Sequence, residues 1–329
     1  MNVLKERIKG RKNYPTEEVD SLNFLNDKEV KDLIEKKDLK FSQKDFIKLY
    51  NCVHCGECDS EKERFLLKQR FIEDGNTFEG HEEMIENFNT YRSPYRSNKM
   101  RIRMPEGIPK SSDTLFFMGC LSTIRIPRYT EHALQFLLKE NIDFTILDTE
   151  ICCGWHLLAS GLKNEFETCK KENVEIFNNY KNILCLCPAC FYLFNVTYRP
   201  ELNENIKVTY IADYLKASKT KKTGKIGIQH LCQLKNRGTE GVDKFVESLL
   251  KKSGYEVANI PHWCCGGGSG WMGRTENIEA IARKRMTDFD REDLDYATTY
   301  CPSCWWILER FSKKCKIKPK AKDIFELLL

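Results

Sequence analysis

Long apolar runs are missing from this 329-residue chain, and none approaches the ~20 residues that a membrane-spanning helix requires. The first 15 residues are charged and hold no apolar core, so we expect no export signal and a cytoplasmic protein. Blocks of like charge are also missing, because 53 Lys and Arg are interspersed with 48 Asp and Glu. We therefore expect no transmembrane segment and no nucleic-acid partner.

Cysteine, by contrast, is abundant, with 16 residues in the chain. A reducing cytoplasm disfavours structural disulfides, so cysteines in this number indicate metal binding or redox chemistry. Ten of them form two sets that share one order of motifs: a single cysteine, then Cys-Cys-Gly, then Cys-Pro-x-Cys. The first set is Cys120, Cys152, Cys153, Cys187 and Cys190, and the second is Cys232, Cys264, Cys265, Cys301 and Cys304.

The spacing of the two sets is that of a duplicated unit. Cys120 and Cys152 both recur after 112 residues, as Cys232 and Cys264, whereas the Cys-Pro-x-Cys recurs after 114. A fixed period with matching local motifs indicates two copies of one structural unit. Buried cysteines scattered through a core would share neither the spacing nor the motifs.

Short apolar strands and amphipathic helices alternate around each set. In the first unit we expect strands at 114–118, 144–147 and 182–187 and helices at 126–139 and 155–180. In the second we expect strands at 225–229, 257–260 and 297–300 and helices at 241–253 and 278–289. This alternation predicts an α/β protein with two duplicated Rossmann-like parallel-sheet units. We place the first unit at residues 108–222, the second at 223–329, and a helical, ferredoxin-like extension at 1–107.

Each cysteine group follows directly after a predicted strand. Ligands of parallel sheets gather at the carboxyl ends of the strands, so we expect the five thiols of each set to meet at one rim. Zinc takes four ligands in a tetrahedron. Five thiolates per set, two of them adjacent in sequence, favour an iron–sulfur cluster instead.

Both sets together resemble the tandem cysteine-rich (CCG) domain of heterodisulfide reductase catalytic subunits. The matching stretches are Cys120-x31-Cys152-Cys153-x33-Cys187-x2-Cys190 and Cys232-x31-Cys264-Cys265-x35-Cys301-x2-Cys304. The resemblance implies that each set holds a noncubane [4Fe-4S] cluster and that the two clusters face a disulfide between the units. In methanogens this disulfide joins coenzyme M and coenzyme B. The sequence departs from the family at residues 229–234, which lack the His-Asp-Pro-Cys-His type of segment, and in a slightly shorter gap after Cys153.

Three functions are compatible with this pattern. The leading hypothesis is an iron–sulfur oxidoreductase that reduces a small anionic disulfide in one-electron steps, within a hetero-oligomeric complex. An iron–sulfur or flavoprotein subunit would donate the electrons. The alternative is a non-catalytic electron-transfer subunit of a flavoprotein or quinone-linked oxidoreductase, because members of the family serve lactate, glycerol-3-phosphate, succinate or fumarate enzymes. A zinc-binding assembly scaffold is the third.

A further run of three cysteines, Cys52, Cys55 and Cys58, begins like a ferredoxin [4Fe-4S] motif. The fourth cysteine of such a motif would come four residues later, where this chain has Lys62. One interpretation is a further cluster with a fourth ligand from a non-cysteine side chain or from Cys169, Cys185 or Cys315. A zinc site that includes His54 or His81 is another, and a run that holds no metal is the third.

Four side chains near the predicted rims are candidates for substrate binding. Arg125, Lys235 and Arg274 each follow a cysteine group, and an anionic substrate needs such cations. Each of them is equally compatible with ordinary surface charge. His156 follows the first Cys-Cys-Gly and could give a proton to a leaving thiolate, or instead cap a helix or donate to cluster sulfide.

Overall fold

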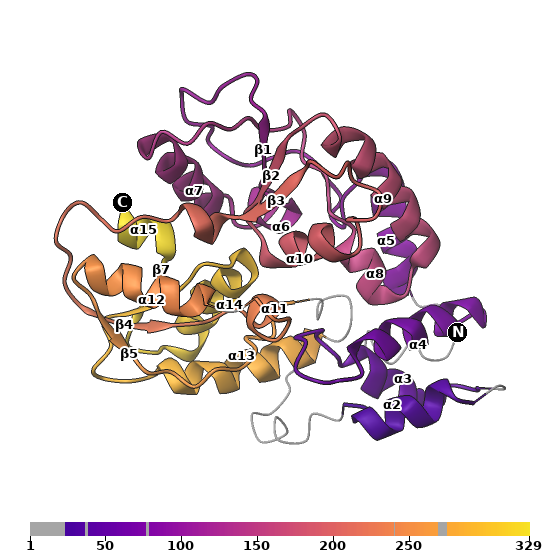
Figure 1. The fold of residues 1–329 in the computed structure, drawn as a ribbon. Helices are drawn as coiled ribbons and strands as arrows, with labels where there is room; N and C mark the ends of the chain where they lie inside the picture. Colours follow the sequence, from indigo (N-terminus) through magenta and orange to yellow (C-terminus); the bar gives the residue numbers. More distant parts are fainter. Residues whose placement is uncertain (1–23, 37–38, 77–78, 240, 269–274) are drawn as a thin grey trace.

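The computed structural model of the protein describes residues 24–36, 39–76, 79–239, 241–268 and 275–329. These residues form two parallel β-sheets flanked by helices, joined to a group of N-terminal helices (Figure 1). The predicted α/β class with two duplicated parallel-sheet units is thereby confirmed. None of the helices in the described part of the chain is long and apolar enough to cross a membrane.

The sheet of the first unit has the order β1-β2-β3, with all neighbours parallel. Its strands are β1 (Thr114–Phe117), β2 (Asn182–Cys185) and β3 (Lys207–Tyr210). The strand expected at 144–147 shrinks to one bridge, in which Thr145 pairs with Leu115 on the free side of β1. This bridge consists of two backbone hydrogen bonds, from Phe116 N to the carbonyl of Thr145 and from Thr145 N to the carbonyl of Thr114.

The sheet of the second unit repeats this arrangement with the order β5-β4-β6-β7. Its strands are β4 (Lys225–Ile228), β5 (Glu256–Ala258), β6 (Tyr296–Thr299) and β7 (Lys320–Asp323). The bridge at Thr145 occupies the position of β5, so both units present the same four positions in the same order. The duplication inferred from the cysteine period is therefore also a duplication of the fold.

Helices connect the strands of each unit as a parallel sheet requires. The first unit contains α6 (Cys120–Ile124), α7 (Pro127–Lys139), α8 (Trp155–Ser160), α9 (Lys163–Phe177), α10 (Pro188–Val196) and the 3-10 turn η2 (Ile211–Tyr214). The second contains α11 (Cys232–Lys235), α12 (Val242–Lys252), α13 (Thr275–Phe289), α14 (Pro302–Cys315) and α15 (Ile324–Leu328). The single helix expected at 155–180 is interrupted at Gly161, whose φ of +89° is not helical.

The N-terminal helices are α2 (Asp27–Ile34), α3 (Gln43–Tyr50), α4 (Glu61–Glu73) and α5 (Glu79–Tyr91). A small apolar core that includes Val30, Leu49 and Leu67 holds α2, α3 and α4 together. This group lies beside α8 of the first unit (Figure 1), where the ammonium of Lys68 donates to the carbonyl of Ala159 at 2.9 Å. The N-terminal segment is thus anchored on the first unit.

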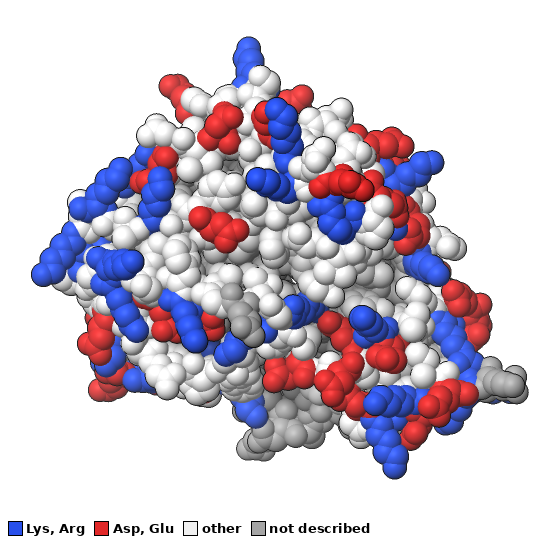
Figure 2. All heavy atoms as spheres, in the orientation of Figure 1, with Lys and Arg blue, Asp and Glu red and all other residues white. Residues whose placement is uncertain are grey.

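The two units share one apolar core. Helix α7 of the first unit packs on α15 of the second, with the rings of Tyr129 and Phe325 5.4 Å apart. Charges of both signs are mixed over the face shown in Figure 2, as the sequence pattern predicts. The shared core holds the carboxyl ends of the two sheets in fixed positions relative to each other.

Candidate functional site

The five thiols of the first set form a continuous chain of contacts. The Sγ atoms of Cys120 and Cys152 lie 3.5 Å apart, and those of Cys153 and Cys190 lie 3.2 Å apart. Hydrogen bonds between Cys152 and Cys153 and between Cys187 and Cys190 complete the chain. The end of β1 positions Cys120, which opens α6, and the end of β2 positions Cys187, which precedes α10. The Cys-Cys pair follows the segment that bridges to β1 at Thr145 and precedes α8.

The second set repeats the same order of contacts. The Sγ atoms of Cys232 and Cys264 lie 3.9 Å apart, and those of Cys265 and Cys304 lie 3.3 Å apart. Cys265 also hydrogen-bonds to Cys264, and Cys304 to Cys301. Two sets of five thiols, spread over distant parts of the sequence, therefore adopt one geometry.

Backbone amides next to each Cys-Cys pair donate to the sulfurs. Gly154 N lies 3.5 Å from the Sγ of Cys152, and Gly266 N lies 3.3 Å from the Sγ of Cys264. Both glycines have a φ of +82°, a conformation that other residues rarely adopt. Amide donors aimed at sulfur stabilise thiolates over thiols, as metal-binding loops require.

The second cysteine of each Cys-Cys pair has a thiol pKa below the ordinary value. Hydrogen bonds with Cys152 and Cys190 lower the pKa of Cys153 well below its ordinary value. Hydrogen bonds with Cys264 and Cys304 do the same for the pKa of Cys265. A thiolate is the form that binds metal, so both sets hold a favoured ligand at the equivalent position.

The thiols do not converge on one point, which bears on the kind of metal they fit. Among the described residues, one group of three His, Cys, Asp or Glu ligand atoms lies within 4.8 Å of one another, and it contains no cysteine: His132, Asp323 and Glu326. A tetrahedral zinc site draws its ligands around a single ion. Chains of five thiols, four of them buried in each set, with amide donors fit a cluster of several irons and sulfides better.

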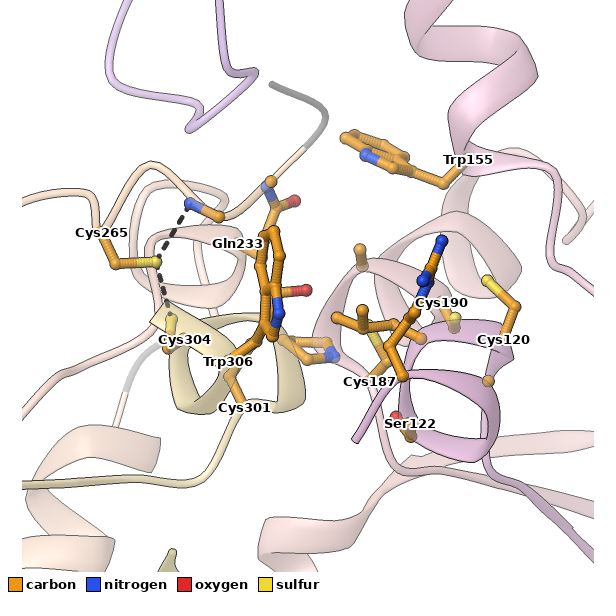
Figure 3. A pocket seen from close by; sticks show the side chains of 18 of the residues that line it. Cys120, Ser122, Trp155, Cys187, Cys190, Gln233, Cys265, Cys301, Cys304 and Trp306 are labelled. Carbon is orange, nitrogen blue, oxygen red and sulfur yellow. Dashed lines mark hydrogen bonds between the residues drawn. The ribbon is translucent and has the colours of Figure 1, made fainter. Parts of the chain in front are cut away.

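Both sets open into one cavity of about 450 Å³ between the two units. Figure 3 shows thiols of the second set on one side and thiols of the first set on the other. Nine of the ten cysteines line it: Cys120, Cys153, Cys187, Cys190, Cys232, Cys264, Cys265, Cys301 and Cys304. A molecule bound there would contact both sets at once.

The candidate substrate-binding residues fall in different places. Arg125 and His156 line the cavity, and Lys235 is not among its lining residues. Arg274 lies outside the residues that the structure describes. Burial lowers the pKa of His156 to about 4, so its imidazole is neutral at pH 7.

Sequence reasoning missed Arg310, which lines the cavity from α14 together with Ser303 and Trp306. These residues lie at i, i+3 and i+7 on one face of the helix, so the Cys-Pro-x-Cys followed by a helix was the available signal. The guanidinium of Arg310 lies 5.7 Å from the Trp306 ring centre, and that of Arg125 lies 4.8 Å from the Tyr95 ring centre. The cavity thus has one arginine on each unit, each held against an aromatic ring.

The three candidates for the missing fourth ligand of the N-terminal run make other contacts. The thiol of Cys169 donates to the carbonyl of Cys152, Cys185 is buried in β2, and Cys315 lies 4.0 Å from Arg283. Of the zinc candidates, His54 hydrogen-bonds to Lys68 at 2.8 Å, and His81 lies 3.4 Å from the hydroxyl of Tyr50. One cysteine of the run, Cys55, hydrogen-bonds to Cys264 of the second set.

The family model of the cysteine-rich domain named CCG matches residues 114–195 and 226–309, one copy in each unit. The chain belongs to the CCG cysteine-rich domain family. The family predicted from the cysteine pattern is thereby confirmed for this tandem CCG protein. Each matched range contains one complete set of five thiols.

Relatives of the tandem CCG protein include an uncharacterized iron–sulfur protein of Methanococcus maripaludis, 26% identical over 84% of this chain and 60% of the relative. The EtfAB:quinone oxidoreductase of Syntrophomonas wolfei is 27% identical over 67% of this chain and 34% of its own length. One subunit of the fumarate reductase (CoM/CoB) of Methanothermobacter marburgensis is 26% identical over 65% of this chain and 45% of its own length. The chain thus spans at most about 60% of these relatives, all of which are named for iron–sulfur or redox chemistry.

Proposed function

We propose that the tandem CCG protein is an iron–sulfur oxidoreductase that reduces a small anionic disulfide. Each five-thiol set would hold a noncubane [4Fe-4S] cluster. The observation that carries the proposal is the single cavity onto which both sets open. Cleavage of a disulfide to two thiols consumes two electrons and two protons, and two one-electron centres on opposite walls would supply the electrons singly, one to each sulfur.

The size of the cavity fits this use. Its volume of about 450 Å³ lies within the range of about 300–1,000 Å³ that is usual for small-molecule sites; the clusters would occupy the part next to the thiols, and a small disulfide would occupy the space between them. Trp155 and Trp306 line opposite sides of it in Figure 3, which limits the water that could compete with a bound sulfur. Both units contribute to its wall, so the two halves of an unsymmetrical disulfide would meet different surroundings.

Two arginines give the cavity its preference for anions. Arg125 comes from the first unit and Arg310 from the second, and both line the cavity. A guanidinium binds carboxylate, sulfonate or phosphate groups through paired hydrogen bonds. A disulfide with an acidic group on each half would place one group at each arginine and its sulfurs between the thiol sets.

The coenzyme M–coenzyme B disulfide is the first substrate to test, since one relative is named as part of a fumarate reductase (CoM/CoB). Anaerobically purified, reduced protein should convert it to the two thiols, and the free thiols should change the EPR signal of the oxidised protein. The absence of both turnover and a thiol-dependent signal would contradict the proposal. We expect the electrons to come from an iron–sulfur or flavoprotein subunit of a larger complex.

The second candidate function is electron transfer without catalysis, in a flavoprotein or quinone-linked complex. The relative named EtfAB:quinone oxidoreductase favours it. Replacing both Arg125 and Arg310 distinguishes the two functions. If the protein reduces disulfides, their loss would abolish reduction of an anionic disulfide but leave electron transfer to a dye acceptor at the wild-type rate. If the protein only transfers electrons, there would be no disulfide reduction to lose.

A further inference from the structure

The N-terminal cysteine run lies against the second unit, not apart from it. Two side chains, one in α11 and one at the C-cap of this helix, bind the backbone of the run. Gln233 donates to the carbonyl of His54 at 2.8 Å, and the C-cap residue Asn236 donates to the carbonyl of Cys55 at 3.0 Å. From α13, Asn277 donates to the carbonyl of Asn51 at 3.0 Å. Helix α11 begins with Cys232, so the run is fixed directly to an element that carries a thiol of the second set.

Close packing leaves the run little freedom at this position. A Cβ added to Gly268, which follows the second Cys-Cys-Gly, would lie 2.7 Å from the carbonyl oxygen of Val53. Arg237 directly follows the C-cap of α11. It donates to the carbonyl of His54 at 3.1 Å and forms an ion pair with Glu61. Its side chain is 5% exposed, so this contact is part of the interior.

The thiol of Cys55 is held at the second set by this docking. It hydrogen-bonds to Cys264, which in turn contacts Cys232 at 3.9 Å and hydrogen-bonds to Cys265. The Cys55–Cys264 contact is therefore of the same kind as those that join the five thiols of each set. Cys55 also receives a hydrogen bond from the amide of Glu57, as Cys264 does from the amide of Gly266.

Cys52, the first cysteine of the run, makes different contacts from those of Cys55. Cys52 accepts from the amide of His54 at 3.4 Å and lies near the ammonium of Lys68, on the side of the first unit. Among the described residues, no cysteine of the run, Cys55 included, belongs to a group of three potential ligands within 4.8 Å of one another, so the run builds no compact site of its own. In the described part of the chain, the strongest interactions of the first-set thiols involve no N-terminal cysteine.

We propose that Cys55 is a sixth sulfur ligand of the cluster in the second unit, supplied by the N-terminal run, so that the two clusters are chemically inequivalent. This rests on the proposed function, because it requires a cluster at the second set. In this role the run completes one existing site in place of building a separate ferredoxin-type site. An added thiolate on one cluster would give the two halves of a bound disulfide different redox partners.

The test uses the full chain, purified and handled without oxygen, with Cys55→Ser compared with Cys52→Ser and Cys58→Ser. Iron and sulfide per chain are measured together with EPR and Mössbauer spectra. Cys301→Ser identifies the signals of the second cluster, and Cys187→Ser those of the first. We expect Cys55→Ser to change the signals of the second cluster alone, and the two control substitutions to leave both clusters as in the wild type.

Two results would overturn the inference. One is a loss of about four irons per chain in all three variants, as for a separate third cluster held by the whole run. The other is a Cys55→Ser protein with wild-type spectra. Arg237→Ala, which keeps all the thiols but loosens the run, should move the second-cluster signals in the same direction as Cys55→Ser. Wild-type protein without iron would instead contradict the proposed function itself.

Discussion

Arg237→Ala should detach the N-terminal run from the second unit. The guanidinium pairs with Glu61, donates to the carbonyl of His54 and lies 4.5 Å from the ring centre of Tyr192. The side chains of Arg237 and Glu61 are 5% and 15% exposed. Without the arginine, Glu61 stays buried in a setting where desolvation already raises the pKa of its carboxyl.

The size of the effect follows from this burial. Removing one partner of a buried ion pair costs about 3–5 kcal/mol. The charges of Arg64 and Lys68 also stabilise the Glu61 carboxylate and partly compensate for the missing arginine. We therefore expect a destabilisation near the lower limit of this range. A cost of about 3 kcal/mol would raise the population of locally open run roughly 150-fold. Protonation removes the buried charge, so the defect should shrink as the pH falls from 7 to 5.

Hydrogen exchange measured by mass spectrometry resolves this locally. Peptides that cover residues 51–61 should exchange roughly 150-fold faster in Arg237→Ala, while those of β1 and β2 stay as in the wild type. The double variant Glu61→Gln with Arg237→Ala should recover most of the protection, because no charge remains buried. An increase of less than about fivefold, as for a surface salt bridge, would mean that the buried pair does not hold the run in place.

Three further predictions concern other parts of the molecule. Gly268→Ala places a Cβ 2.7 Å from the carbonyl oxygen of Val53. The substitution should lower the free energy of unfolding by about 1–3 kcal/mol and the melting temperature by several degrees, and an unchanged melting temperature would contradict the docking of the run at this position. Arg125→Ala and Arg310→Ala should each raise KM for an anionic disulfide by roughly 10- to 150-fold and leave a neutral disulfide unaffected, with the exposed Arg128→Ala as the matched control; equal effects on both substrates would exclude anion binding. The hydrogen bond from His132 to Asp323, 2.7 Å long, raises the pKa of His132, so charged His132 stabilises the fold below the unfolded pKa and this stability is lost as the pH rises through the folded pKa. His132→Asn should therefore flatten the dependence of the unfolding free energy on pH between pH 6 and 8. Equal slopes for the wild type and the variant would contradict this assignment.

The cysteine sets were the most predictable feature, because their motifs recur in the same order with a nearly fixed period along the chain. Strands β3 and β7 escaped prediction since their sequences, Lys-Val-Thr-Tyr and Lys-Ala-Lys-Asp, carry charge at a sheet edge. The break at Gly161 was also missed. It depends on α4, a helix distant in sequence: a Cβ there would lie 2.4 Å from the carbonyl oxygen of Lys68.

The candidate site likewise contains one feature that the sequence could have predicted and one that it could not. Arg310 was within reach of sequence reasoning, because it lies on the α14 face that already carries Ser303 and Trp306. The contact of Cys55 with Cys264 was not, since it joins residues more than 200 positions apart and depends on how the run docks against α11. Such a contact has no period or motif that could reveal it.

In the proposed function, two thiol-held clusters act together on one disulfide in the shared cavity. EPR spectroscopy of anaerobically purified, oxidised protein during titration with the product thiol tests this most directly, on samples of measured iron content. We predict about eight or more irons per chain and a new paramagnetic signal that appears with thiol and weakens in Arg310→Ala. Zinc in place of iron, or cluster signals that thiol leaves unchanged, would contradict the proposed function.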